Sequence, residues 1–188
     1  MAADQIPSPA RRADAERNRD KILAAAGTAF ADPEAEVSMA EISRRAGVGM
    51  ATLYRNFPGR LELLEALYNE EVDALCLAAE NPGPQTPGAA LIAWLGRFFE
   101  FVPSKRLMIA ELLEHTDRGN PVLRANRARV LSAGQPLLSA AQAAHEIRDD
   151  LTLEQILDMI VAISKIHHDP GYTQPMFQIL LDGLRSPA

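Results

Sequence analysis

Two short helical segments separated by Gly47-Val48-Gly49 constrain this chain more than any other feature. Ser38 opens the first segment as a helix cap, and Glu41 follows at the spacing of a reciprocal capping box. The second segment runs from Met50 to Phe57 and is stopped by Pro58-Gly59. Two short helices joined by a glycine turn form a helix-turn-helix, so we expect this motif rather than a strand or one long helix.

Both segments are amphipathic, which divides their residues into an inner and an outer set. The inner set should pack on a preceding helix that we expect to run from Ala15 to about Phe30; it comprises Ile42, Ala46, Val48, Leu53 and Phe57. The second helix of such a motif can enter the major groove of duplex DNA. The outward residues are therefore candidate DNA contacts, and they are Met50, Ala51, Thr52, Tyr54, Arg55 and Asn56, with Ser38, Arg44 and Arg45 on or near the preceding helix.

Helical periodicity continues to the C-terminus, and no stretch shows the sustained alternation of a strand. We therefore predict an all-α fold. Further helices are expected at about 60–80, 91–102, 107–113, 121–146 with an interruption near Gly134-Pro136, 153–166 and 172–184. We predict three regions: a disordered basic arm at 1–14, a helix-turn-helix domain at 15–59, and a domain for effector binding and dimerisation at 60–188.

The net charge of −6 argues at first against a nucleic-acid partner, because DNA attracts basic surfaces. The charge is unevenly distributed. Residues 1–60 carry nine Arg or Lys against eight Asp or Glu, whereas the rest carries ten against seventeen. No stretch approaches the ~20 apolar residues of a spanning helix, so we expect a cytoplasmic protein without a membrane partner. The single cysteine, Cys76, is expected to be a buried, inert thiol.

The helix-turn-helix region resembles the tetracycline-repressor (TetR) family of bacterial regulators. The matching run extends from Val37 to Arg60 and reads VSMAEISRRAGVGMATLYRNFPGR; it is preceded by Arg19-Asp20-Lys21-Ile22-Leu23-Ala24-Ala25-Ala26. The resemblance covers about residues 15–70. It implies a homodimer of nine or ten helices per chain, a palindromic operator, and usually repression that a small-molecule ligand relieves.

The resemblance also implies roles for single positions. Ser38 and Met39 would contact phosphates, as would Tyr54 and Asn56, and Arg60 would clamp the DNA backbone. The base-facing positions would be Ala40, Met50, Ala51, Thr52 and Arg55. Two departures matter: Ala40 stands where some members place a base-reading arginine, and Asn56 replaces a frequent histidine. Readout would then rest on Arg55 for a guanine and on Thr52 or Ala51 for a thymine methyl.

Several of these residues keep a second interpretation. Tyr54 could belong mainly to the core with its hydroxyl at the surface. Arg44 and Arg45 could simply be the favourable positive charges at a helix C-terminus. The Arg11-Arg12 pair could be a solubilising arm or a minor-groove contact.

The C-terminal region carries an aromatic stripe, because Trp94, Phe98 and Phe101 share one helical face. Such a stripe is either core or the lining of a pocket for a largely apolar effector. Our candidate effector residues are Trp94, Phe98, Phe101, Met108, His115 and His145.

Dimerisation follows from symmetry, since one short recognition helix reads too few base pairs and a twofold pair reads twice as many. The last two helices carry more apolar positions than one body should bury, so we expect them to form a four-helix bundle with a second copy. The candidate interface residues are Ile156, Ile160, Ile163, Phe177, Leu180, Leu181 and Leu184.

The rival class is an enzyme or a metalloprotein. His167-His168-Asp169 suggests a metal site, but adjacent imidazoles on a helix diverge, and the segment is better explained as a helix end. The sequence contains no Glu-x-x-His, glycine-rich phosphate loop or Gly-x-Ser-x-Gly turn. We therefore expect no enzyme activity, cofactor or metal. A helical adaptor without a regulatory role remains as the other alternative, but it would not need the polar third helix.

Overall fold

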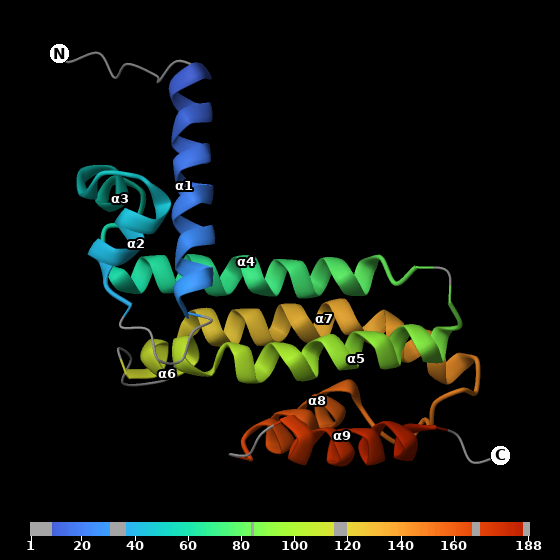
Figure 1. Cartoon of the computed structure of the whole chain (residues 1–188). Helices are drawn as coiled ribbons and strands as arrows, with labels where there is room; N and C mark the ends of the chain where they lie inside the picture. The colour runs from blue at the N-terminus through green and yellow to red at the C-terminus, as the bar shows by residue number, and fades with distance from the viewer. Residues whose placement is uncertain (1–8, 31–36, 84, 115–119, 167–169, 186–188) are drawn as a thin grey trace. The chain divides into compact units, whose positions relative to one another are not determined.

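The computed structural model describes residues 9–30, 37–83, 85–114, 120–166 and 170–185, and the regular elements in these ranges are α-helices (Figure 1). Within these ranges the one departure from helix and loop is an isolated bridge between Ile147 and Arg185. The predicted all-α class is confirmed. The helices are α1 (Pro9–Phe30), α2 (Met39–Ala46), α3 (Met50–Asn56), α4 (Arg60–Glu80), α5 (Pro87–Ser104), α6 (Arg106–Glu114), α7 (Pro121–Ala143), α8 (Leu153–Ser164) and α9 (Pro170–Leu184).

The chain forms two compact units that divide between Tyr68 and Asn69, inside α4. The first unit contains α1, α2, α3 and the first turns of α4, and the second contains the other helices. From the sequence we predict the boundary between residues 59 and 60, which is the start of α4.

Several helix ends differ from the sequence expectations. Helix α1 begins at Pro9 rather than Ala15, so residues 9–14 of the expected disordered arm are helical, while residues 1–8 lie outside the described ranges. Helix α9 begins at Pro170 rather than Tyr172, and α8 ends at Ser164. Proline suits the first turn of a helix because the N–H it lacks would have no intrahelical partner there.

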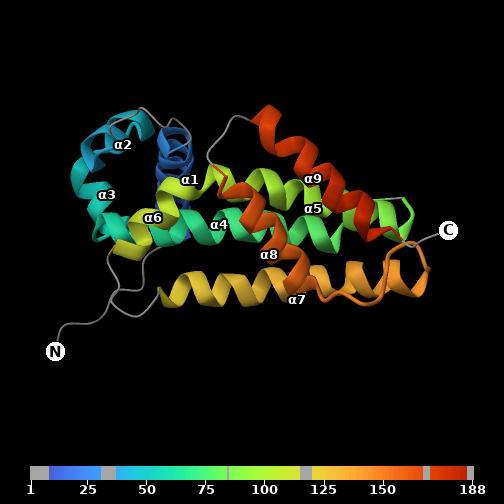
Figure 2. The ribbon, with the colours of Figure 1, turned by 90° about the horizontal axis from the view of Figure 1, so that it is seen from below.

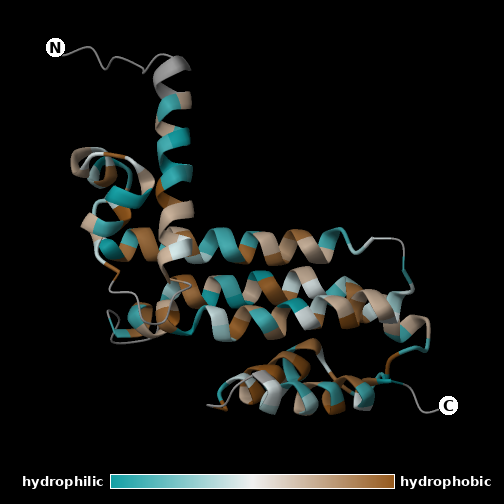
Figure 3. Cartoon of the chain, viewed as in Figure 1, coloured by the Kyte–Doolittle hydropathy of each residue, from teal (hydrophilic) through white to brown (hydrophobic). Residues whose placement is uncertain are grey.

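The first unit is held together by apolar side chains from α1, α2 and α3. Ile22 of α1, Ile42 of α2 and Leu53 of α3 are completely buried, and Phe57 is nearly so. Figure 3 shows hydrophilic turns near the N-terminus of α1 and apolar turns toward its C-terminal end, where this packing occurs. The inner set expected from the sequence is thus confirmed for its large members.

The turn between α2 and α3 requires glycine at position 47. Gly47 has a φ of 65°, a left-handed conformation that strains residues with a Cβ atom. Its N–H donates to the Arg44 carbonyl at 3.2 Å, and the Val48 N–H donates to the Ser43 carbonyl at 3.1 Å. The buried Ser43 hydroxyl closes the turn by donating to the Val48 carbonyl at 2.6 Å.

The second unit is organised around Trp94 of α5. Its side chain is buried, and the indole Nε1 donates to the Leu75 carbonyl of α4 at 3.1 Å. Helix α5 lies against α7, and the indole occupies the space above Gly134 of α7. A single side chain therefore contacts both α4 and α7, which lie far apart in the sequence.

Helix α7 is continuous from Pro121 to Ala143, so the interruption predicted near Gly134-Pro136 is wrong. Gly134 is buried and provides room for Trp94 instead of ending the helix. Pro136 lies on the exposed side, where water can satisfy the carbonyl group that proline leaves without a donor.

A buried amide joins α7 to the second half of α4. Asn126 donates from Nδ2 to Oδ1 of Asn69 at 2.7 Å, and its own Oδ1 accepts from Nη1 of Arg129 at 2.8 Å. Arg129 also forms an ion pair with Asp73 of α4. Because a buried amide must keep its partners, these bonds fix how α4 is aligned along α7.

Helix α8 packs against α5 and α7, and α9 packs against α8 and α5. Figure 2 shows α8 lying across α5 and α7, and Phe99 of α5 stacks on Phe177 of α9 with ring centroids 4.2 Å apart. Within the described residues, no helix has both the length and the apolar character needed to cross a bilayer.

Replacing Gly134 with alanine tests the packing of Trp94. The new Cβ atom would lie 2.6 Å from Cζ3 of Trp94 and 3.0 Å from Cδ2 of Leu153, so the rigid indole must move. Overpacking of this kind costs roughly 1–3 kcal/mol, which should exceed the gain of about 1 kcal/mol in helix propensity. We expect a lower free energy of unfolding for Gly134→Ala in urea titrations. Gly96→Ala is the control, because no atom lies within 4 Å of its new Cβ; equal effects of the two changes would contradict this account.

Candidate nucleic-acid interface

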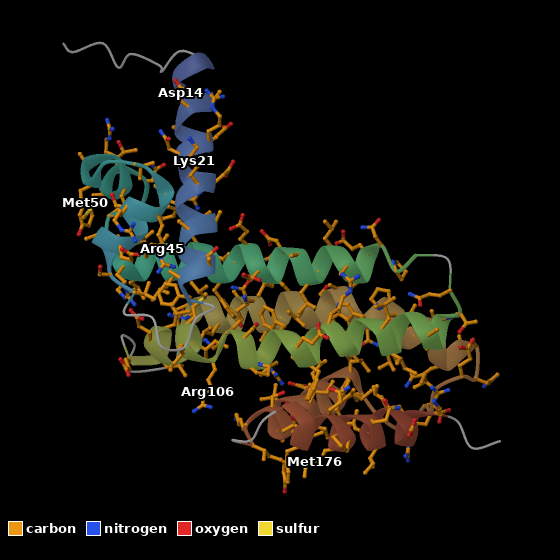
Figure 4. All side chains as sticks on the ribbon, viewed as in Figure 1. Asp14, Lys21, Arg45, Met50, Arg106 and Met176 are labelled. Atoms are coloured by element: carbon orange, nitrogen blue, oxygen red, sulfur yellow. The ribbon has the colours of Figure 1, made fainter. Side chains whose placement is uncertain are left out.

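Helix α3 has one buried side and one exposed side. Leu53 and the following Phe57 point into the core, whereas Ala51 and Arg55 are exposed and Met50 and Tyr54 are 39% and 47% exposed. Figure 4 shows Met50 on the side of α3 that faces away from α1. The exposure of Tyr54 excludes the interpretation of this residue as mainly core. The outer side of α3 is therefore a polar surface that a nucleic acid can approach.

Hydrogen bonds within α3 hold its polar side chains in place. Arg55 donates from Nη2 to Oγ1 of Thr52 at 2.9 Å, and Asn56 donates from Nδ2 to the Thr52 carbonyl at 2.8 Å. Thr52 and Asn56 are half-buried. The Thr52 hydroxyl thus holds the Arg55 guanidinium beside the helix while its other N–H groups can still donate to a base.

The start of α2 is capped by Ser38, whose hydroxyl accepts from the Glu41 N–H at 3.1 Å. The second half of the predicted capping box is wrong. The Glu41 carboxylate accepts instead from Arg44 at 2.6 and 2.8 Å and from Arg45 at 2.6 Å. Two guanidinium groups one turn further along the helix bind a carboxylate more strongly than a neutral backbone N–H does.

The pairing of Glu41 with Arg44 and Arg45 lowers the pKa of its carboxyl group to about 2. The group is therefore ionised at neutral pH, and its bonds to both arginines would be lost only as the pH falls toward 2. The Arg44 side chain is nonetheless 73% exposed. Next to it, Met39 is half-buried and Ala40 is exposed in the first turn of α2. The last turn of α2 presents a net positive charge to solvent, although the Glu41 carboxylate partly neutralises it.

Two further arginines of this unit lie over aromatic rings. Arg60 donates to the Val37 carbonyl, and its guanidinium carbon is 5.1 Å from the centre of the Phe30 ring. These contacts hold the start of α4 to the residues before α2. The guanidinium carbon of Arg19 in α1 is 4.6 Å from the centre of the Phe57 ring, just after α3. Sequence reasoning did not include Arg19 in the site, because its contact with Phe57 joins distant segments.

The candidate effector residues fall into different environments. Trp94, Phe98 and Met108 are buried in the core of the second unit, and Phe98 stacks between Trp94 and Phe101 with centroids 6.3 Å apart in both pairs. Phe101 is half-buried beside a groove between α4 and α5. His115 lies outside the described residues. His145 is exposed after α7 and lines a cavity of about 620 Å³.

Burial also corrects the candidate dimer residues. Five of them are buried inside a single chain, so their side chains are not available to a second copy; they are Ile156, Ile160, Phe177, Leu181 and Leu184. Ile163 and Leu180 are half-buried. The exposed apolar side chains of the same two helices are Met159, Tyr172 and Ile179, with Met176 half-exposed beside them (Figure 4). Sequence reasoning missed these three because both sides of α8 and α9 are rich in apolar residues.

Two family models match the chain. Residues 22–67 match the model described as bacterial regulatory proteins of the tetR family. Residues 86–186 match the model described as the C-terminal domain of SbtR-like transcriptional regulators. No curated protein matches the chain.

Solved structures agree with these matches. A TetR transcriptional regulator from Streptomyces coelicolor is 36% identical, covers 90% of this chain and 99% of its own, and has a TM-score of 0.76. A TetR transcription regulatory protein from Mycobacterium vanbaalenii is 30% identical over 93% of this chain and 98% of its own, with a TM-score of 0.73. The fold is also similar to RolR in complex with resorcinol, at 20% identity, 94% and 91% coverage and a TM-score of 0.57.

Replacing Glu41 with glutamine tests the charge at the start of α2. The change frees the guanidinium groups of Arg44 and Arg45, so we expect tighter binding to DNA of any sequence. The plot of log affinity against log salt should steepen by about one unit, as for one additional neutralised phosphate. Fluorescence anisotropy with an unrelated duplex at several salt concentrations measures both. Glu80→Gln, which makes the same charge change in the second unit, is the control; if it strengthened binding equally, net charge alone would be the cause.

Proposed function

Because the chain belongs to the TetR family of bacterial transcriptional regulators, we propose that it is a repressor that binds a palindromic operator as a homodimer and is released by a small-molecule effector. The observation that carries this proposal is the polar outer side of α3, which is held by the buried Leu53 and Phe57 on the opposite side. A helix with this division can insert its outer side into the major groove.

The roles proposed for single residues follow from their chemistry. Arg55 can donate two parallel hydrogen bonds to O6 and N7 of a guanine, and Ala51 or the methyl group of Thr52 can contact a thymine methyl. The phosphate contacts are assigned to residues with a hydroxyl, amide, guanidinium or free backbone N–H at the rim of this surface: Ser38, Met39, Arg44, Tyr54, Asn56 and Arg60. Ala40 and Met50 complete the base-facing surface.

The proposal of a homodimer is supported by the exposed apolar side of α8 and α9. Met159 and Ile163 recur at helical spacing on α8, as do Tyr172, Met176, Ile179, Leu180 and Gly183 on α9. We call these residues the α8–α9 surface. Ile179 is 73% exposed in the single chain, which favours burial against a second copy. A twofold pair of chains would then read two half-sites of a palindrome.

The proposal of ligand release rests on thermodynamic linkage. Suppose that an effector binds best to a conformation that does not fit the operator. The effector then weakens operator binding, and the operator weakens effector binding by the same factor. RolR, which shares the fold, has been solved with resorcinol bound. This chain is accordingly proposed to respond to a small molecule as well.

Substitution of Arg55 tests sequence readout. Arg55→Ala should reduce affinity for an operator obtained by in vitro selection by about 10- to 100-fold, which corresponds to roughly 1–3 kcal/mol for a lost bidentate contact to guanine. Affinity for a scrambled duplex should change much less. Tyr54→Phe removes only a phosphate-bonding hydroxyl and should weaken both duplexes equally. An unchanged ratio of operator to scrambled affinity in Arg55→Ala would exclude Arg55 as a base-reading residue.

Substitution of Ile179 tests the α8–α9 surface. A carboxylate at this exposed position costs little in a single chain, but in a dimer it would be buried without a partner. We expect Ile179→Glu to shift the protein from dimer to monomer in sedimentation equilibrium while its helical circular dichroism is unchanged. Leu77→Glu is the control, because Leu77 is 59% exposed on α4. If the Ile179→Glu protein remained dimeric, the α8–α9 surface would be excluded as the dimer interface.

A further inference from the structure

Helix α7 ends in a motif that normally uses glycine, yet this chain places His145 there. The His145 N–H donates to the Gln142 carbonyl at 2.9 Å and the Glu146 N–H donates to the Ala141 carbonyl at 3.1 Å, which together form a Schellman motif. His145 has a φ of 57°, and it is the one residue other than glycine with a positive φ in the described part of the chain. Residues other than glycine adopt this backbone conformation at a cost in stability, and residues in such strained conformations cluster at functional sites.

The loop that follows His145 is firmly held. Gln142 donates from Nε2 to the carbonyls of Arg148 and Leu151 at 3.0 and 3.2 Å. Arg148 binds both carboxylate oxygens of Asp150 at 2.5 and 2.6 Å, and its N–H donates to the Leu184 carbonyl of α9 at 2.9 Å. These bonds satisfy Gln142, Arg148 and Asp150 without any ligand, so the walls of the loop are ordered in advance.

A cavity of about 620 Å³ lies between this loop and the end of α9. Its lining comprises Gln142, His145, Ile147, Arg148, Asp149, Asp150 and Arg185. Three charged or titratable groups of this lining are not used by the loop. Within the described residues, the His145 imidazole and the Asp149 carboxylate have no hydrogen-bond or ion-pair partner, and Arg185 has only a long contact of 3.9 Å with Asp182.

We propose that this cavity binds a small zwitterion of the α-amino acid type. Its carboxylate would accept from the Arg185 guanidinium and the His145 imidazole, and its ammonium group would donate to Asp149. As the effector site of the regulator, the cavity rests on the function proposed above. It is separate from the aromatic stripe of α5, whose members Trp94 and Phe98 are buried in the core.

Charge favours a zwitterion over other ligands. The unused groups are one cation, one anion and one imidazole. A ligand with a single charge would pair with only one of the two charged groups and leave the other without a partner. The described residues contain no group of three or more His, Cys, Asp or Glu arranged to hold a metal ion. The volume exceeds that of a single amino acid, which leaves room for a side chain beside Ile147.

The test is isothermal titration calorimetry of the full-length protein with each of the common L-amino acids. We expect at least one to bind, and its decarboxylated amine and its deaminated acid to bind at least tenfold more weakly. Asp149→Asn and Arg185→Gln should each weaken binding about tenfold or more. Asp158→Asn is the control, because Asp158 pairs with Arg127 on the α7–α8 surface and does not line the cavity. Binding by none of the amino acids, or equal binding by an acid that lacks the amine, overturns the proposal.

His145→Gly separates this role from a structural one. Glycine relieves the left-handed conformation, so the melting temperature should rise by about 2–4 °C, while affinity for the amino acid should fall about tenfold. His145→Asn, which tolerates this conformation, should also lose affinity. A variant that gains stability and keeps full affinity overturns the assignment of His145.

Operator binding by the same samples distinguishes this proposal from the function proposed above. The amino acid should weaken binding to the selected operator in the native protein but not in Asp149→Asn. An amino acid that binds without changing operator affinity overturns the effector role of the cavity. A protein that binds no selected DNA overturns the repressor, and calorimetry still decides whether the cavity binds its ligand.

Discussion

The packing of one indole ring over one glycine is the constraint on which the second unit depends. Trp94 contacts Gly134 of α7 and donates to the Leu75 carbonyl of α4, so three helices must come together at one level. The amide bonds of Asn126 then align α4 along α7. Because this centre is filled by a rigid ring, Trp94 and Phe98 are core residues, whereas the cavity that we propose as a ligand site lies where helices end.

The first unit solves a different problem, which is to hold two very short helices without much core. Isolated helices of this length are unstable, so caps and burial must replace the missing turns. Ser38 and Gly47 supply the caps, and Ile42, Leu53 and Phe57 supply the buried side. Every exposed position of α3 is then left for recognition. The bonds of Arg44 and Arg45 to Glu41 partly neutralise the positive charge of this small surface.

Much of this could be predicted from the sequence, because caps, glycine turns and apolar spacing act locally. The helix-turn-helix, the exposed side of α3 and the all-α class follow from Ser38, Gly47 and the period of Leu53 and Phe57. What could not be predicted depends on partners distant in sequence. In the sequence, Gly134 suggests a helix break, and only the fold shows that it provides room for Trp94. Ile160 and Ile179 are equally apolar, but only Ile179 is exposed. The Glu41 carboxylate likewise had two possible local partners, the Ser38 N–H and the two arginines, and the capping pattern does not compare the strengths of these hydrogen bonds.

The position of Trp94 also determines what can be observed in solution. It is the chain's one tryptophan, and its surroundings come from α4, α5, α7 and α8 of the second unit. Tryptophan emission therefore reports the packing of that unit alone. The helix-turn-helix unit contains no tryptophan, so it can melt without changing this signal. A fluorescence melting curve would thus describe the C-terminal unit of the regulator and leave the helix-turn-helix unit unseen.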